Sequence, residues 1–192
     1  MIIPYLMLHF DRIIVVEPVD YVPFNRGWIK NVGFLLSFAG PDDSVYFHDA
    51  DTLPTSDTWV YPPVPRGCVV HLYGHRHCLG GIVGVDPAVF NYIGGFPHTD
   101  AWGGEDRQLQ SACIKNNIRI DRSLFKERFK TFDVVELAEN GSVEPAEIGR
   151  KALMLKCAKY KHVDLFGCLH KASYKLASSL KTNGVRHCVV AP

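Results

Sequence analysis

The feature that most constrains the fold of this chain is a short apolar segment that ends on two acids. The stretch VYFHDADTLP, residues 45–54, begins with β-branched and aromatic residues and then changes to acids and a proline, which sheets disfavour. It predicts a strand over residues 44–48 whose C-terminal end opens into a loop. Residues two apart on an extended chain point to the same side, so Asp49 and Asp51 face one point in space. Two like charges held that close favour a cation between them.

Composition limits what such a site can serve. The chain has 192 residues, of which 47% are hydrophobic, so we expect one domain, residues 1–192, with a single core. Its 21 Lys+Arg and 20 Asp+Glu give a net charge of +1, which offers no case for nucleic acid or an anionic membrane as partner. The six cysteines include no C-x-x-C pair, which argues against a zinc knuckle or a thioredoxin-type motif.

The N-terminal segment resembles the inside of an α/β unit. MIIPYLMLHFDR has no basic region before its short apolar run, so we expect neither a signal peptide nor a membrane anchor, and a cytoplasmic protein if the chain is complete. The run IIVVEP, residues 13–18, predicts a parallel strand buried on both faces, and PYLMLHF before it the tail of a helix. The strand that normally precedes such a helix is missing, as in a fragment.

A helix is expected next, over NRGWIKNVGFLLSFAG, residues 25–40, because its apolar residues recur at helical spacing and it ends on Gly40-Pro41. Strand, helix and strand in this order predict a crossover unit of a parallel sheet. Ligands of open α/β sheets bind at the carboxyl ends of strands, where Asp49 and Asp51 fall.

Further along, the pattern predicts a strand over residues 69–73, a break at Gly80-Gly81, a strand over 82–85 and a short helix from Asp86-Pro87 to Gly94-Gly95. A longer helix follows, with Glu105 and Asp106 in its first turn. Acids there are favoured by the helix dipole, so capping and catalysis are both open for this pair on spacing alone.

Four blocks together point to a family. FNRGWIKNVGF, FHDADTLP, CLGGIVGVD and GGFPHTDAWGGEDRQL occur in this order, and over roughly residues 9–122 the sequence resembles the β-1,4-galactosyltransferases, metal-dependent glycosyltransferases with the GT-A nucleotide-sugar fold. The resemblance implies an α/β, GT-A-like fold with a mostly parallel central sheet and its first strand missing. It also implies a UDP-sugar donor and a glycan or glycoconjugate acceptor.

The resemblance assigns a role to each matching residue. Asp106 would be the catalytic base, with Glu105 holding the acceptor, and Asp51 would bind Mn²⁺ or Mg²⁺, ions that hard oxygen ligands favour. The residues that would face the nucleotide or the donor sugar are Phe24, Asn25, Arg26, Asp49, Gly80, Gly81 and Trp102.

The implied function is an inverting, metal-dependent transfer of galactose or N-acetylhexosamine from a UDP-sugar to an acceptor hydroxyl, in which one carboxylate takes the acceptor proton. One alternative is a retaining enzyme similar to the polypeptide N-acetylgalactosaminyltransferases, whose Trp-Gly-Gly-Glu run is similar. The other is a catalytically inactive nucleotide-sugar-binding or glycan-binding domain.

The sequence departs from the family pattern at three places. No histidine stands where the family has its third metal ligand, and Asp133 or Glu136 could replace it. Arg107 stands where a third acid is expected in the acceptor-binding run. Cys78 stands where the family has a tyrosine beside the donor sugar, which leaves more room there, so the identity of the donor sugar is not determined.

Three further features concern the histidines and the C-terminal part of the chain. His71, His75 and His77 alternate along a strand and could share a zinc ion, but the Gly74 interruption and the lack of a fourth ligand favour structural roles. Residues 145–160 predict a helix. HKASYKLASSLK, residues 170–181, fits either a closing strand or an amphipathic helix with a basic face.

Overall fold

A computed structural model describes residues 2–19, 24–98, 103–128, 130–131, 133–136, 175–182 and 185–191. No helix in these described ranges is long and apolar enough to cross a membrane. The elements in chain order are α1 (Ile2–Leu6), β1 (Ile13–Pro18), α2 (Arg26–Ser37), β2 (Val45–His48), β3 (Thr52–Pro54), β4 (Cys68–Gly74), β5 (Ile82–Val85), α3 (Pro87–Ile93), α4 (Glu105–Lys115), β6 (Arg119–Asp121), β7 (Lys126–Glu127), β8 (Val134–Glu136), β9 (Lys175–Thr182) and β10 (Val185–Ala191).

The largest sheet has five strands and is mixed. Its order is β2-β5-β4-β6, with β7 also paired to β4. β5 runs antiparallel to both β2 and β4, whereas β6 and β7 run parallel to β4. The prediction of a mostly parallel sheet is therefore wrong for these pairings. The physical reason is the short connection of residues 75–81, which folds β5 back on β4 as a hairpin, since a parallel return needs a longer crossover.

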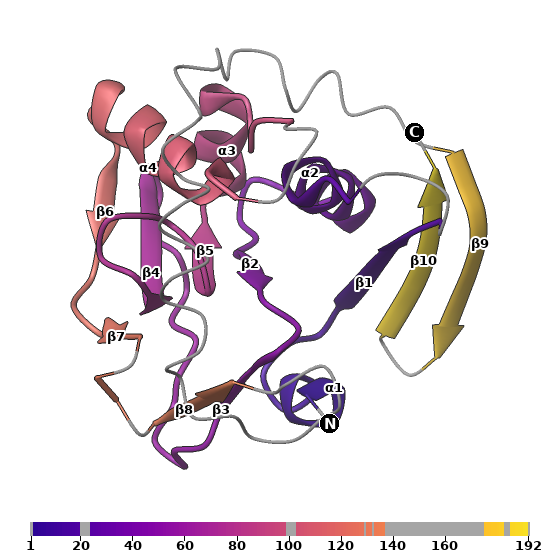
Figure 1. The fold of residues 1–192 in the computed structure, drawn as a ribbon, viewed down its shortest axis with the longest axis horizontal. Coiled ribbons are helices and arrows are strands. Elements are labelled where there is room, and N and C mark those ends of the chain that lie inside the picture. Colours follow the sequence, from indigo (N-terminus) through magenta and orange to yellow (C-terminus); the bar gives the residue numbers. More distant parts are fainter. Residues whose placement is uncertain are drawn as a thin grey trace.

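β1 lies in a separate three-stranded sheet with β10 and β9 (Figure 1). It pairs parallel with β10, from Ile13 opposite Val185 to Pro18 opposite Val190. The strand itself is confirmed, but its predicted burial on both faces is wrong, because Glu17 is exposed and pairs with His187 at 2.8 Å. The predicted β1-α2-β2 crossover within one sheet is also not found, because β2 pairs in the other sheet.

Helix α2 packs against both sheets (Figure 1). Phe34 is in the main core, where its ring lies 4.6 Å from that of Phe90. Trp28, Val32 and Leu36 belong to a second core, whose other buried members are Cys188 and Val190 of β10. Because α2 buries one side on each sheet, its polar N-terminal turn is held at the edge between them, next to the end of β2.

The other predicted elements are confirmed at the expected places. β2, β4, β5, α3 and α4 all form, and α3 is capped by Asp86, whose side chain accepts from Ala88 N at 3.0 Å. The helix ends at Gly94 with φ 86°, a left-handed conformation that glycine adopts without strain. Residues 175–182 form strand β9, so of the two structures predicted for this segment the closing strand is confirmed and the amphipathic helix is wrong. The helix predicted over residues 145–160 lies outside the described residues.

Asn31 joins α2 to the segment that leads toward α4. Its side chain is fully buried, donates to Phe96 O at 2.8 Å and accepts from Phe96 N at 2.9 Å. Both backbone groups of one residue are thus satisfied by a single amide, which fixes residues 94–98 against α2.

We expect Asn31→Ala to lower the free energy of unfolding by about 2–4 kcal/mol, because two buried backbone groups lose their partners. Asn91→Ala is the control, since the Asn91 side chain is exposed and bonds only the carbonyl of Pro87 in its own helix. Urea unfolding of both variants measures the difference, and equal losses would show that the Phe96 bonds contribute little.

Candidate functional site

A cavity of about 1090 Å³ opens where β2, the turn after β4 and the first turns of α2 and α4 meet. Eight of the residues predicted for the site line it, namely Phe24, Arg26, Asp49, Asp51, Gly80, Gly81, Glu105 and Asp106. The fold therefore brings the acids that follow β2 and the acids of α4, which are more than 50 residues apart in sequence, to one cavity.

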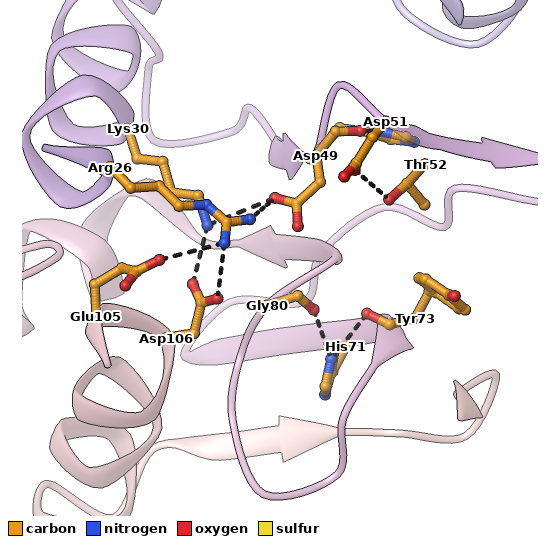
Figure 2. Close-up of polar contacts among 11 residues, drawn as sticks. Arg26, Lys30, Asp49, Asp51, Thr52, His71, Tyr73, Gly80, Glu105 and Asp106 are labelled. Carbon is orange, nitrogen blue, oxygen red and sulfur yellow. Dashed lines mark hydrogen bonds and ion pairs between the residues drawn. The ribbon is translucent and has the colours of Figure 1, made fainter. Parts of the chain in front are cut away.

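Two cations of α2 connect these acids (Figure 2). Arg26 pairs with Asp49 and lies 3.4 Å from Glu105 Oε1 and 3.7 Å from Asp106 Oδ2. Lys30 Nζ lies 2.9 Å from Asp106 Oδ1 and 3.8 Å from Asp49 Oδ1. None of the five side chains is more than 21% exposed. We call these five residues the charge cluster.

Lys30 is the member that the sequence reasoning missed. It is four residues after Arg26, so both side chains leave the same face of α2. Its ammonium also lies 4.7 Å from the centre of the Phe96 ring. The sequence did contain a signal for Lys30: it forms a basic pair with Arg26 at a spacing of four residues, in the first half of the helix that precedes the D-x-D strand.

The charge cluster shifts the pKa values of its members in different directions. Burial by itself would raise the pKa of Asp49, but the nearby Lys30 and Arg26 hold it below its ordinary value. Burial, and then the charge of Asp106, raises the pKa of Glu105, whose side chain is only 1% exposed. Glu105 has no hydrogen bond among the described residues, and its contact with Arg26 at 3.4 Å is a charge contact. Glu105 is thus the acid of the cluster most inclined to hold a proton.

Asp106 does not act as a helix cap. The N-cap of α4 is Gly104, which has no side-chain cap hydrogen bond, and the Asp106 carboxylate is bonded to Lys30. Asp106 Oδ2 also lies so close to Gly80 that a Cβ there would be 2.3 Å from it. The absence of a side chain at Gly80 is what lets the α4 acid approach the β4–β5 connection.

The metal predicted at Asp51 fits only if the substrate supplies further ligands. Asp51 is exposed in the cavity, and its Oδ1 accepts from the Thr52 hydroxyl at 3.2 Å. No group of three or more His, Cys, Asp or Glu side chains that could hold a metal occurs among the described residues. One carboxylate together with phosphate oxygens and water is an ordinary site for Mg²⁺ or Mn²⁺. The donor set present therefore fits an ion shared with a diphosphate.

The register of β3 and β8 separates the two candidates for a third metal ligand. Glu136 pairs with Thr52, the residue after Asp51. Asp133 lies at the other end of the pairing, just before β8, where its carbonyl accepts from Thr55 N. The Asp133 side chain pairs with Lys126 at 3.0 Å. The backbone of Glu136 is thus nearer to Asp51 than that of Asp133, and a ligand role for either residue stays a prediction.

The remaining predicted donor residues differ in their placement. Asn25 caps α2, since its Oδ1 accepts from Trp28 N at 2.9 Å, and Phe24 is 52% exposed and lines the cavity. The Gly81 carbonyl accepts from Asp49 N at 3.0 Å, which joins the glycine turn to the end of β2. Trp102 lies outside the described residues. Nucleotide contact by these residues stays a prediction.

His71 anchors the glycine turn from below (Figure 2). Its Nε2 donates to the carbonyls of Tyr73 and Gly80 at 3.0 and 3.1 Å, and its Nδ1 accepts from Arg122 Nε at 3.1 Å. These partners fix the neutral ring with its proton on Nε2. His71 therefore has a structural role, which the sequence analysis favoured over a zinc site. His75 and His77 stack on each other, with ring centres 5.3 Å apart.

Comparison with known proteins agrees with this geometry. A family model described as the N-terminal domain of galactosyltransferase matches residues 71–134. Human β-1,4-galactosyltransferase 5 is 38% identical over 105 residues, which are 50% of this chain and 27% of the human protein. Rat β-1,4-galactosyltransferase 6 is 36% identical over 118 residues, 56% of this chain and 31% of the rat protein. The chain thus spans less than a third of the length of these relatives.

Solved structures give the fold. The catalytic domain of Drosophila β1,4-galactosyltransferase 7 in complex with xylobiose superposes with a TM-score of 0.60 over 93% of this chain and 79% of that one, at 20% identity. A mutant of the same enzyme in complex with manganese, UDP-Gal and xylobiose gives 0.60 over the same shares, at 19% identity. The α/β, GT-A-like fold and the resemblance to the β-1,4-galactosyltransferases are therefore confirmed.

The buried His71 predicts an acid-sensitive fold. Burial, and then the charge of Arg122, lowers its pKa from 6.5 to about 4. The unfolded chain therefore binds a proton between pH 6.5 and pH 4 that the folded chain does not, so stability falls as the pH falls through this window. We expect His71 to contribute up to about 3 kcal/mol to this loss.

The measurement is urea unfolding at several pH values for the parent chain and for His71→Gln. Gln does not titrate, so the slope of stability against pH between 4 and 6.5 should be smaller in the variant, whatever its stability at pH 7. Parallel slopes would mean that His71 is not the titrating group.

If Asp51 is the main protein ligand of a divalent ion, metal binding should depend on the nucleotide, whose phosphates would supply the other oxygens. We expect Mn²⁺ alone to bind the chain weakly, and Mn²⁺ to tighten UDP binding. Asp51→Asn should abolish most of this gain, since an amide oxygen is a poorer ligand for a hard cation than a carboxylate. Titration calorimetry of UDP with and without Mn²⁺ measures it, and an unchanged gain in the variant would exclude Asp51 as ligand.

Proposed function

We propose that this chain, which resembles the β-1,4-galactosyltransferases in sequence and has a GT-A-like fold, is an inverting, metal-dependent hexosyltransferase domain. It would transfer galactose or N-acetylhexosamine from a UDP-sugar to an acceptor hydroxyl. The observation that carries the proposal is the position of the Asp106 carboxylate, against Gly80 and connected through Lys30 to Asp49 at the end of β2.

The donor would lie along the end of β2 and the glycine turn. Asp49, Asp51, Gly80 and Gly81 all line the cavity there. Arg26 presents a fork of donors that suits phosphate oxygens, and a diphosphate would compete with the carboxylates that now surround it. A divalent ion, held by Asp51 and the diphosphate when bound, would neutralise the charge that develops on the departing UDP.

The acceptor would lie on the α4 side. In the proposed reaction an Asp106 oxygen takes the proton of the acceptor hydroxyl as that oxygen attacks the donor sugar. Glu105, the preceding residue, leaves the helix about 100° away and has a raised pKa, so its carboxyl group is suited to donate a hydrogen bond to another oxygen of the acceptor. Lys30 would keep the Asp106 carboxylate beside Gly80.

A single base on the acceptor side suits direct displacement, which inverts the anomeric centre. A retaining enzyme would not need that base, and an inactive binding domain would not need Asp106 at all. The anomeric configuration of the product distinguishes an inverting from a retaining enzyme. Release of UDP from UDP-galactose in the presence of an acceptor and Mn²⁺ distinguishes a transferase from an inactive binding domain.

We expect Asp106→Asn to lower the transfer rate by about 10²–10⁴-fold, the usual contribution of a positioned general base, while UDP binding stays within a few-fold of the parent. Asp57→Asn is the matched control, because it makes the same chemical change at an exposed position outside the cavity lining.

The measurements are UDP release in a transfer assay with and without Mn²⁺, and UDP affinity by calorimetry, for the parent and both variants. A rate for Asp106→Asn within a few-fold of the parent would remove the base from the proposal. No Mn²⁺-dependent UDP release from the parent with any glycan acceptor would favour the inactive binding domain.

A further inference from the structure

Lys30 has more hydrogen-bond donors than its neighbours use. Its ammonium group carries three N–H donors, and one of them donates to Asp106 Oδ1 at 2.9 Å. Asp49 Oδ1 lies 3.8 Å from Nζ, which is a charge contact but too long for a hydrogen bond. The other donors of Lys30 therefore have no acceptor in the part of the chain that the structure describes, although the side chain is only 12% exposed.

The position of this ammonium group limits what can accept from it. Lys30 lines the cavity, as do Asp49 after β2 and Gly80 of the glycine turn. Figure 2 shows the ammonium between the carboxylates of Asp49 and Asp106. Its Nζ also lies 4.7 Å from the centre of the ring of Phe96, which is fully buried, so one side of the ammonium is covered. The unused donors are thus held where the end of β2 and the start of α4 meet.

The charge cluster can accept an anion at this point. Asp49 pairs with Arg26, and Asp106 Oδ2 lies 3.7 Å from the same guanidinium. Burial, and then the charge of Asp106, raises the pKa of Glu105. When Glu105 holds its proton, two cations face two carboxylates, and the cluster carries no excess of negative charge that would repel an anion.

An anion with several oxygens is the group that suits these donors. An apolar group beside Lys30 would leave its free N–H donors without acceptors in a mostly buried site, which costs free energy. Phosphate oxygens form charge-assisted hydrogen bonds with an ammonium group, and these are stronger than bonds between neutral groups. In the proposed function, the diphosphate of the donor is the anion that lies at the end of β2.

We propose that Lys30 binds the diphosphate of the UDP-sugar and stabilises it as the leaving group, while it keeps its hydrogen bond to Asp106. This inference rests on the proposed function and adds a residue to the machinery of that reaction. The acceptor oxygen forms a bond to the anomeric carbon, and the acceptor proton passes to Asp106. The bond between that carbon and the β-phosphate oxygen breaks, and its electron pair stays on that oxygen. Lys30 remains protonated and donates to the phosphate.

One ammonium group would in this way connect the base with the leaving group. Asp106 loses its negative charge as it takes the acceptor proton, and the departing diphosphate gains negative charge in the same step. The attraction between Lys30 and the phosphate is therefore expected to be stronger in the transition state than in the ground state. An interaction of that kind raises kcat and does not only lower KM.

The test compares ligands with and without phosphate. UDP affinity by calorimetry and uridine affinity by NMR titration are measured for the parent chain, Lys30→Met and Lys30→Arg, all in the presence of Mn²⁺. Met keeps an unbranched side chain beside Phe96 but removes the charge. We expect Lys30→Met to weaken UDP binding about tenfold or more, the loss of a charge-assisted hydrogen bond, and to leave uridine binding unchanged. Lys30→Arg should recover part of the UDP affinity, because it keeps a cation with N–H donors.

Two further comparisons separate this effect from a change in the fold. Lys30→Met leaves the Asp106 carboxylate without its hydrogen-bond donor, so Lys30→Met/Asp106→Asn is also compared with Asp106→Asn alone. The same loss of UDP affinity is expected in that background. Lys115→Met makes the same chemical change at an exposed position in the last turn of α4, outside the cavity lining, and should leave UDP affinity unchanged.

A turnover measurement tests the role in the reaction. At saturating UDP-galactose, Lys30→Met should lower kcat about tenfold or more, because the leaving group loses a cation. An unchanged kcat in this variant overturns the leaving-group role.

Equal UDP affinity in the parent and in Lys30→Met overturns the inference, and so does an equal fractional loss for uridine and UDP, which would mean that the substitution disturbs the whole site. If the parent transfers galactose in either case, only the inference is rejected. A phosphate-dependent loss in a chain that never releases UDP from UDP-galactose supports the diphosphate contact and rejects the transferase. No binding of UDP by the parent overturns both.

Discussion

The site depends on one contact between charges, the pairing of Arg26 and Lys30 of α2 with the carboxylates of β2 and α4. Asp49 comes from the end of a strand, and Glu105 and Asp106 from the start of a helix more than 50 residues later. Three acids this close, with little access to water, would repel one another strongly if no cation lay between them. The two α2 side chains are what let the three acids share one cavity, and they connect the end of β2 with the start of α4.

That contact requires α2 to be held firmly, and the packing explains how. The helix is buried against the five-stranded sheet through Phe34 and against β10 through Trp28, Val32 and Leu36. Asn31 adds a specific bond to the backbone of Phe96. Lys30 lies between these anchors and Arg26 two residues before the first of them, so the packing of the helix fixes where both side chains start. The stability of the core and the geometry of the charge cluster are linked through one helix.

The charges of the cavity are concentrated at the end of β2, where acids meet the two cations of α2, as suits the proposed diphosphate with a divalent ion. Gly80 lies beside this region, and its lack of a side chain lets the Asp106 carboxylate approach it. Small and charged residues thus determine the site, while the large apolar residues determine where it lies.

Strand, cap and turn preferences act over a few neighbours, so the local elements could be predicted from the sequence. The strand before Asp49, the Asp86 cap of α3 and the acids at the start of α4 are examples. Local patterns did not predict the mixed sheet, the separation of β1 from β2, the position of Lys30 or the partners of His71. These depend on contacts between residues far apart in the chain, where a side chain's partner is set by packing and not by its neighbours in sequence.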